Sequence, residues 1–211
     1  MQNLVKALVK KLARTLLGDY SAYHIYSWPA GDVPASMPGT TAAFTVRSID
    51  ESEIESSGEP LIREQAGYAG ADSHAYACFD ADRIVAICFY WFGDRYRKRN
   101  FWPLGDGEVK LVQIIALPDV RGRGAATLLL ASSCRDILQK GFCRAYARIW
   151  HSNTPSLRAF ERAGWARAAL VLEINPLRRR RPIRIRVDSK WRRRGTMSAA
   201  RSGELGAGTP K

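Results

Sequence analysis

One stretch of this chain constrains its fold more than any other: an apolar, strand-like run that leads through a basic, glycine-containing turn into a helix. The run covers residues 109–117 and is followed by Pro118. The turn contains Arg121-Gly-Arg-Gly124, and residues 125–140 then carry apolar side chains at helical spacing as far as Gly141. The stretch therefore joins a predicted strand to a predicted helix.

The same turn has the chemistry of a phosphate-binding site. The first amides of a helix lack internal hydrogen-bond partners and lie at the positive end of the helix dipole. Gly122 and Gly124 allow positive φ angles and a close approach of a ligand, and Arg121 and Arg123 add two positive charges. We therefore expect a diphosphate here. A P-loop is excluded because no Gly-Lys-Ser/Thr follows, and Thr127 stands where the dinucleotide fingerprint needs Gly or Ala.

A second segment, residues 153–165, predicts a capped amphipathic helix. It reads Asn-Thr-Pro-Ser-Leu-Arg-Ala-Phe-Glu-Arg-Ala-Gly-Trp. Thr154 suits the N-cap, Pro155 suits the first helical position, and Gly164 suits the end of the helix.

Together, the two segments resemble the motifs of the GCN5-related N-acetyltransferase (GNAT) family. That family has Arg/Gln-x-x-Gly-x-Gly/Ala after a strand and a proline, which Arg121-x-x-Gly124-x-Ala126 matches. Its later motif, Asn-x-x-Ser/Ala-x-x-x-Tyr-x-x-x-Gly-Phe, matches residues 153–165, except that Phe160 stands at the position of the tyrosine. The resemblance extends over residues 44–174.

The resemblance implies an α/β (α+β) fold with a mixed, mostly antiparallel central sheet flanked by helices. Two neighbouring strands, residues 109–117 and 144–150, are expected to splay apart. From the sequence pattern, we also expect one or two short helices within residues 51–66. The other strands are expected at residues 44–47, 75–79, 84–92 and 168–174.

Charge divides the chain into three parts, although its total is +13. Residues 1–42 hold a basic segment with amphipathic helical spacing at 3–17 and a Pro/Gly-rich connection at 27–42. Residues 43–175 are the expected acetyltransferase domain, and residues 19–175 are nearly neutral in sum. Residues 176–211 are an Arg-rich extension, in which the alternation at 182–188 allows a last strand, and a tail expected to be disordered.

In the resemblance, the arm of a CoA thioester lies in the gap between the splayed strands and pairs with the backbone of the first one. Its diphosphate meets the amides at the start of the helix. The residues that this implies for binding the co-substrate are Ile115, Ala116, Leu117, Arg121, Gly122, Arg123, Gly124, Ala125, Ala126, Asn153 and Phe160.

The reaction implied is direct attack of an amine on the acetyl thioester. An alkyl ammonium has a pKa of about 10.4, so a base or water chain must remove a proton. Glu108 is the first candidate, with Asp106 and His151 as weaker ones, although Glu108 is equally well explained as a surface carboxylate at a strand end. Because Phe160 has no hydroxyl, Ser156, His151 or a water would assist the leaving thiolate, or the chain would bind CoA and catalyse poorly.

The function expected is an acetyl-CoA-dependent N-acetyltransferase acting on a primary amine of a small molecule or sugar. The co-substrate is acetyl-CoA or another acyl-CoA, without a metal. A protein N-acetyltransferase is one alternative. Another is a degenerate CoA-binding module attached to an anionic membrane surface or to nucleic acid by its basic ends. A homodimer is one option for its assembly.

The acceptor is not determined by these patterns. The loop at residues 93–107 carries Arg95, Arg97, Lys98 and Arg99. Either this loop borders the acceptor cleft and attracts an acidic or phosphorylated substrate, or it is a solvated hairpin.

Cysteine and histidine usage indicates neither a metal site nor a disulfide framework. The four cysteines have no paired metal spacing, and the three histidines are scattered. We interpret the cysteines as small buried side chains in a reducing compartment. With no long apolar run, the expected location is cytoplasmic, or peripheral at the inner membrane surface if the N-terminal segment binds lipid.

Overall fold

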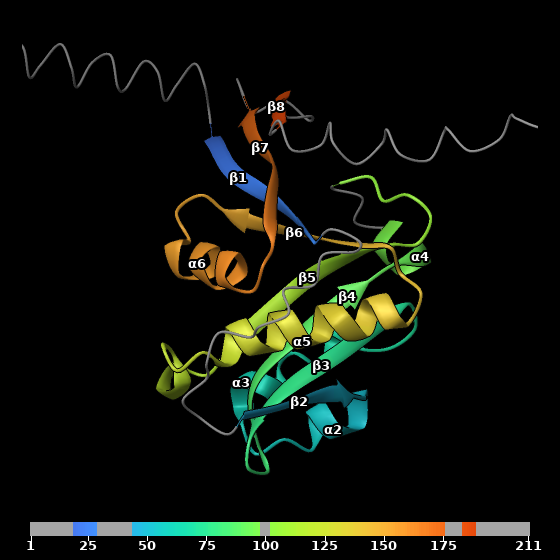
Figure 1. The fold of residues 1–211 in the computed structure, drawn as a ribbon, viewed down its shortest axis with the longest axis vertical. Coiled ribbons are helices and arrows are strands. Elements are labelled where there is room, and N and C mark those ends of the chain that lie inside the picture. Colours follow the sequence, from blue (N-terminus) through green and yellow to red (C-terminus); the bar gives the residue numbers. More distant parts are fainter. Residues whose placement is uncertain (1–18, 29–43, 98–101, 176–182, 189–211) are drawn as a thin grey trace, which may run out of the picture.

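The computed structural model describes residues 19–28, 44–97, 102–175 and 183–188, and in these residues helices pack on one sheet (Figure 1). The order of its strands is β2-β3-β4-β5-β6-β1-β7-β8. The strands are β1 (Asp19–Trp28), β2 (Phe44–Ile49), β3 (Ser73–Asp80), β4 (Arg83–Trp91), β5 (Glu108–Ala116), β6 (Arg144–Trp150), β7 (Ala166–Asn175) and β8 (Ile183–Asp188). The helices are α2 (Glu51–Glu55), α3 (Pro60–Arg63), α4 (Gly93–Arg97), α5 (Ala125–Gln139) and α6 (Thr154–Arg162), with 3-10 turns η1 (Ala66–Tyr68) and η2 (Pro118–Val120).

One pair of neighbouring strands, β5 with β6, is parallel, and the other described pairs are antiparallel. The parallel register runs only from Glu108 opposite Arg144 to Leu111 opposite Ala147. Beyond that point, β5 stays with β4 and β6 stays with β1. The two strands therefore diverge as a V (Figure 1), which confirms the predicted mixed sheet and the predicted splay.

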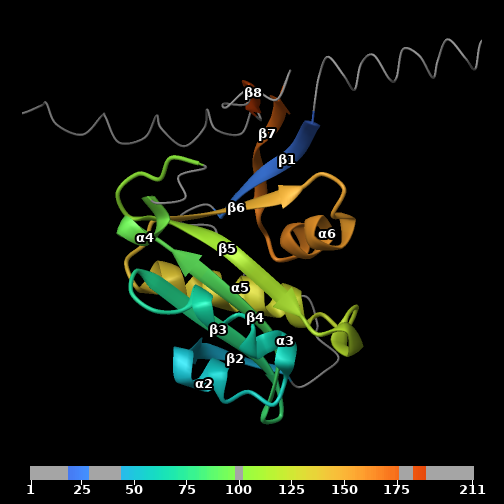
Figure 2. The same ribbon diagram turned by 180° about the vertical axis from the view of Figure 1, so that it is seen from behind.

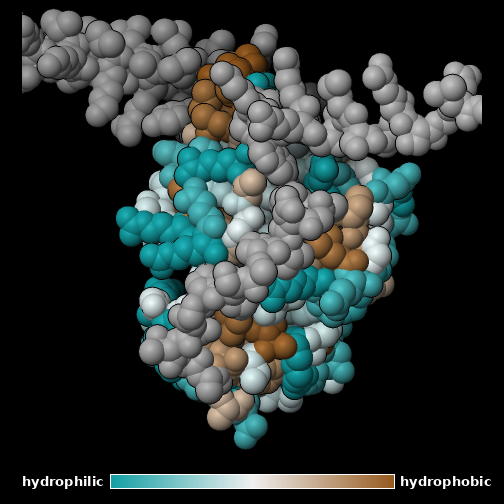
Figure 3. All heavy atoms as spheres, viewed as in Figure 1, coloured by the Kyte–Doolittle hydropathy of each residue, from teal (hydrophilic) through white to brown (hydrophobic). Residues whose placement is uncertain are grey.

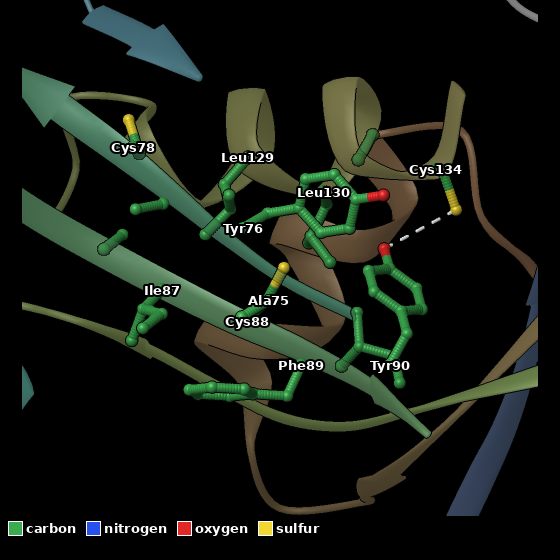
Figure 4. Close-up of a cluster of buried hydrophobic side chains, with 14 of the residues drawn as sticks. Ala75, Tyr76, Cys78, Ile87, Cys88, Phe89, Tyr90, Leu129, Leu130 and Cys134 are labelled. Carbon is green, nitrogen blue, oxygen red and sulfur yellow. Dashed lines mark hydrogen bonds between the residues drawn. The ribbon is translucent and has the colours of Figure 1, made fainter. Parts of the chain in front are cut away.

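Helix α5 covers one face of the sheet over β2, β3 and β4, and the core lies beneath it. Figure 4 shows Tyr76 of β3 and Tyr90 of β4 directed at this helix. The Tyr90 hydroxyl lies 2.8 Å from Oγ of Ser133, and Tyr76 donates a hydrogen bond to Asp136. Cys78, Cys88 and Cys134 are buried in the same core, as expected of small apolar side chains, whereas Cys143 is exposed.

The opposite face of the sheet carries α3 and η1, as the view from behind shows (Figure 2). Tyr68 of η1 packs against the rings of Phe89 and Trp91, with ring centroids 5.5 and 5.6 Å apart. Side chains alternate between the two faces of a strand, so these rings point away from the side that Tyr90 occupies. Tyr68 thereby places an aromatic wall beside the strand pair that opens into the V.

The structure adds a strand that the sequence analysis did not predict. Residues 19–28 were assigned to the segment leading into the domain, with 27–42 as a loop, but β1 lies inside the sheet between β6 and β7. Its side chains Tyr23, Ile25, Tyr26 and Trp28 are at most 1 % exposed. The pairing of β1 with β7 shifts register between the adjacent apolar residues Ile25 and Tyr26. Two successive apolar residues interrupt the alternation of apolar and polar residues from which strands are predicted.

Two other local predictions are corrected. Residues 93–97 form α4 instead of loop. The N-cap of α6 is Asn153, one residue before the expected Thr154, because the Asn153 side chain accepts the amide of Ser156 at 3.3 Å.

The last strand allowed by the alternation at 182–188 is present as β8, paired with β7. Its Ile183, Ile185 and Val187 are exposed, and apolar atoms gather over this end of the sheet (Figure 3). The amphipathic segment predicted at 3–17 and the tail at 195–211 lie outside the described residues. None of the helices in the described part of the chain is both long and apolar enough to cross a membrane.

Candidate active site

The turn between β5 and α5 has the backbone of an anion site. Gly124 is the N-cap of α5 with φ +91°, and Gly122 has φ +81°. Both angles lie in the left-handed region that disfavours residues with a Cβ. No side chain caps the helix at Gly124, so the first amides of α5 face outward from the turn. A Cβ on Gly122 would meet no atom within 4 Å, which leaves open space for a ligand there.

Charges around this turn are arranged in pairs. Arg83 binds the Asp119 carboxylate with Nη1 and Glu59 with Nε, both at 2.6 Å. Hydrogen bonding to Arg83 lowers the pKa of Asp119. Arg123 contacts Asp80 at 3.1 Å, and its guanidinium lies 5.0 Å from the Phe44 ring centroid. The Arg123 side chain is thus directed at the β3–β4 turn.

A cavity of about 580 Å³ lies where β5 and β6 diverge. It is bounded by both arms of the V, by the start of α6, and by residues of η1, α4 and β8. The lining residues are Tyr68, Tyr96, Lys110, Leu111, Val112, Gln113, Ile114, Arg148, Ile149, Trp150, Asn153, Ser156, Phe160 and Arg184.

Three of the predicted site residues, Asn153, Ser156 and Phe160, line this cavity. Phe160 is 2 % exposed, and its ring lies 5.9 Å from Tyr26 and 5.0 Å from Trp165. The predicted residues at 115–117 continue β5 from the cavity to the turn, and Leu117 is fixed there by its amide, which donates to Val85 O at 2.9 Å. The cavity and the turn therefore lie at opposite ends of the same stretch of β5.

Two of the candidate catalytic residues, Glu108 and His151, are not among the residues that line the cavity. Glu108 sits at the closed end of the V, where it accepts the Gly105 amide at 2.8 Å and the Tyr146 hydroxyl at 3.2 Å. His151 lies in the turn after β6, with Nδ1 3.0 Å from Ala22 O. That geometry favours the tautomer in which Nδ1 donates to the carbonyl. The third candidate, Asp106, accepts a hydrogen bond from the Cys143 thiol at its backbone carbonyl, at 3.7 Å.

The sequence analysis missed Lys110, which lines the cavity and is only 4 % exposed. Burial and the nearby positive charge of Arg148 hold its pKa well below the usual value. The sequence did contain an indication that Lys110 is unusual: Lys110 and Gln113 are the two polar residues in the otherwise apolar run 109–117. Gln113 donates through Nε2 to Oε1 of Gln65 at 2.9 Å, which ties β5 to the segment between α3 and η1.

The sequence matches the profile of the acetyltransferase (GNAT) family over residues 42–165. The chain belongs to the GNAT acetyltransferase family. GNAT membership implies an acyl-CoA co-substrate. No curated protein resembles this GNAT chain closely enough to be counted as a relative.

Solved structures share the fold of this GNAT protein at low sequence identity. An acetyltransferase of the GNAT family from Colwellia psychrerythraea is 12 % identical with a TM-score of 0.53, over 79 % of this chain and 60 % of that one. A GCN5-related N-acetyltransferase from Sphaerobacter thermophilus is 14 % identical at 0.52, over 82 % and 56 %. A GNAT-family protein from Novosphingobium aromaticivorans is 14 % identical at 0.52, over 74 % and 64 %. This chain thus spans less than two thirds of each of these structures.

The residues of this GNAT domain fit an acyl-CoA. Past Leu111, the edge of β5 that faced β6 has no described strand beside it, so an extended arm can pair with its backbone. That edge leads to the glycine turn and the amides of α5, which suit a diphosphate. Among the described residues, no cluster of three or more His, Cys, Asp or Glu is arranged to hold a metal ion.

Proposed function

We propose that this GNAT enzyme transfers the acetyl group of acetyl-CoA to the primary amine of a small molecule or sugar by direct attack on the thioester. The observation that carries the proposal is that β5 runs from a cavity of about 580 Å³, which its residues 110–114 line, to the glycine turn at the start of α5. A volume of this order suits a small acceptor. In the transfer, an N–C bond forms, the C–S bond breaks, the thiolate leaves with the electron pair, and the amine gives up a proton.

The proposed co-substrate contacts are mostly backbone. The edge of β5 at residues 112–117 would hold the arm, and the amides of residues 122–126 would hold the diphosphate. Asn153 contributes indirectly: its side chain caps α6 and so fixes the helix start that carries Ser156 into the cavity. The side chain of Arg121 is exposed beside the turn and is the cation proposed to approach the diphosphate.

Proton handling in this proposal differs from the family pattern. Phe160 cannot donate a proton to the leaving thiolate, and Ser156 is the predicted candidate that lines the cavity. A thiol with a pKa of about 8.5 leaves without full protonation, so the missing tyrosine does not prevent transfer. Glu108 remains the proposed final acceptor of the amine proton, by relay through water and the Tyr146 hydroxyl that it binds.

Two alternatives receive less support. The lining residues come from β5, β6, β8, α4, α6 and η1 and surround a space of small-molecule size, which favours a small acceptor over a protein. A role for the basic ends in binding a membrane or nucleic acid concerns residues outside the described part of the chain. A reducing, cytoplasmic setting stays part of the proposal, supported by the free thiols of the four cysteines.

The proposal is tested by following release of free CoA thiol from acetyl-CoA, with primary amines as acceptors and their N,N-dimethyl analogues as controls. We expect saturable thiol release that requires the primary amine, with the N-acetylated amine as product. Thiol release that is the same without an amine would mean hydrolysis and would refute N-acetyl transfer.

A further inference from the structure

Basic side chains gather in the wall of the cavity. Three of its lining residues are basic, Lys110, Arg148 and Arg184, and none of the described lining residues is a carboxylate. A site for a plain ammonium acceptor would repel its substrate with such walls. The charge pattern therefore carries information about the acceptor beyond its amine.

Lys110 is the most informative of the three. It lies in β5 with Trp91 of β4 and Tyr146 of β6 as its register partners, and it is 4 % exposed. Placing a cation in such a position is unfavourable unless something compensates for the lost hydration. The low pKa of Lys110 reflects that cost, and an anion bound beside it would offset the cost and restore the charge.

Arg148 on β6 and Arg184 on β8 are each held by contacts of their own. The Arg148 guanidinium lies 5.2 Å from the Trp150 ring centroid and 5.4 Å from that of Tyr23, so aromatic faces hold it. Arg184 of β8 donates through Nε to Glu173 at 2.7 Å. The cations thus come from three different strands and converge on one cavity.

The co-substrate does not account for these cations. The proposed diphosphate turn begins after Ala116, six residues beyond Lys110 along β5. At about 3.3 Å per residue, that separation is roughly 20 Å. Lys110 is also next to the closed end of the V, on the side of Tyr68 and Tyr96, opposite to the turn. These charges therefore face whatever enters from the acceptor side.

We propose that the amine acceptor carries an anionic group, a carboxylate or phosphate, which Lys110 and Arg148 bind while the aromatic walls contact its body. This inference rests on the proposed amine acetylation and specifies its substrate class. Charge-assisted hydrogen bonds from an ammonium and a guanidinium suit both anions.

The first experiment compares kcat/KM for matched amines with and without the anion. Glucosamine 6-phosphate is set against glucosamine, and amino acids are set against their amides, so the two pairs separate phosphate from carboxylate. We expect the anionic member of at least one pair to be preferred at least tenfold. In Arg148→Gln, that preference ratio should fall about tenfold or more, as expected when one charged hydrogen bond is lost.

Arg186→Gln is the matched control, because Arg186 is an exposed arginine on β8 that does not line the cavity and packs 4.2 Å from the Trp102 ring centroid. The preference ratio of this variant should equal that of the wild type. Equal loss on anionic and neutral amines in Arg148→Gln would mean that the cation acts on the reacting group, and would overturn the inference.

A binding measurement separates this inference from the proposed function. Inorganic phosphate, added with saturating acetyl-CoA so that the turn is filled, should raise the Tm of the wild type and of Arg186→Gln, but not of Lys110→Met or Arg148→Gln. A rise in Tm with phosphate, but no acetyl transfer to any amine, would support the anion site and refute the amine acetylation. Efficient acetyl transfer to neutral amines, with no rise in Tm on adding phosphate, would refute the anion site and support the amine acetylation.

Discussion

Leu111 on β5 and Ala147 on β6 are the last residues at which these two strands lie in register, and the cavity opens beside them. This pair marks the point at which the two strands begin to diverge. On the closed side of the V lie Lys110 and Glu108, and on its open side β5 leads to the glycine turn. The acyl-CoA is accordingly proposed to extend from the glycine turn along β5 to the cavity, where the acceptor meets it.

Gly124→Glu should abolish acetyl-CoA binding without unfolding the domain. The substitution places bulk and negative charge at the N-cap of α5, where we propose the diphosphate to bind. Calorimetric titration should be done at about 0.15 M salt, where the Debye length is about 8 Å and non-specific attraction by a basic protein is screened.

Gly141→Glu is the control for that experiment. Gly141 follows the other end of the same helix, has φ +94°, and has no atom within 4 Å of an added Cβ. The backbone strain and charge change are therefore matched, and acetyl-CoA affinity should stay at the wild-type value. Equal affinity in Gly124→Glu and Gly141→Glu would exclude the turn as the binding site.

Arg83→Met should weaken acetyl-CoA binding about two- to fivefold, the range expected for an exposed ion pair. Arg83 neutralises Asp119 in the turn at 2.6 Å, and without it a carboxylate would face the incoming diphosphate. The double variant Arg83→Met/Asp119→Asn should regain most of the affinity in the same titration. If the double variant binds as weakly as the single one, the effect of Arg83 is structural.

Lys110→Met should raise the free energy of unfolding at neutral pH by about 1–4 kcal/mol, because it removes a buried cation. The pKa of Lys110 is lowered on folding, so the unfolded chain binds this proton more tightly. The loss of stability that Lys110 causes is complete at pH values below its pKa in the folded protein. It disappears as the pH rises towards its pKa in the unfolded chain, about 10.4. Urea unfolding at several pH values should show the stabilisation shrinking as the pH rises. A variant less stable than wild type at every pH would contradict this.

Tyr26→Phe should lower the free energy of unfolding by about 0.5–1.5 kcal/mol. The Tyr26 hydroxyl donates to Glu161 at 2.8 Å and accepts from Arg167 Nε at 2.8 Å, which joins β1, α6 and β7. Burial and the bond to Glu161 raise the pKa of Tyr26 to about 12. A double-mutant cycle with Glu161→Gln, followed by urea unfolding, should give a coupling energy of similar size. Additive effects would show that the two side chains do not cooperate.

The elements nearest the site are those that the sequence predicts best. Strand 144–150, helix 125–139 and the helix that begins after Asn153 are local patterns, with a proline or glycine marking their boundaries. Their periodicity is visible within a few residues, so no knowledge of distant contacts is needed. The same holds for the glycine turn, whose positive φ angles follow from the residue type.

The remainder of the site depends on contacts between distant residues, which periodicity cannot reveal. Arg83 reaches Asp119 from 36 positions away, and Tyr68 meets Trp91 across the face of the sheet. Lys110 was passed over because a single lysine in an apolar run gives no indication of where its side chain ends. The sequence suggested Glu108 as a base but could not show that Tyr146 and Gly105 donate hydrogen bonds to its oxygens, so that the proposed proton transfer to it needs a relay.

The position of β1 has a consequence for how the protein is made. Strand β1 is synthesised before β6 and β7, its two neighbours. The hydrogen bond from Tyr26 to Glu161 cannot form until Glu161, 135 positions later in the chain, has been made. Until then, the backbone groups of β1 have no strand to pair with, a state that favours association between chains. Contacts between such distant residues are slow to form, because the loop between them must close first. Insertion of β1 is thus expected to be a late event in folding, because both of its neighbouring strands must be available first.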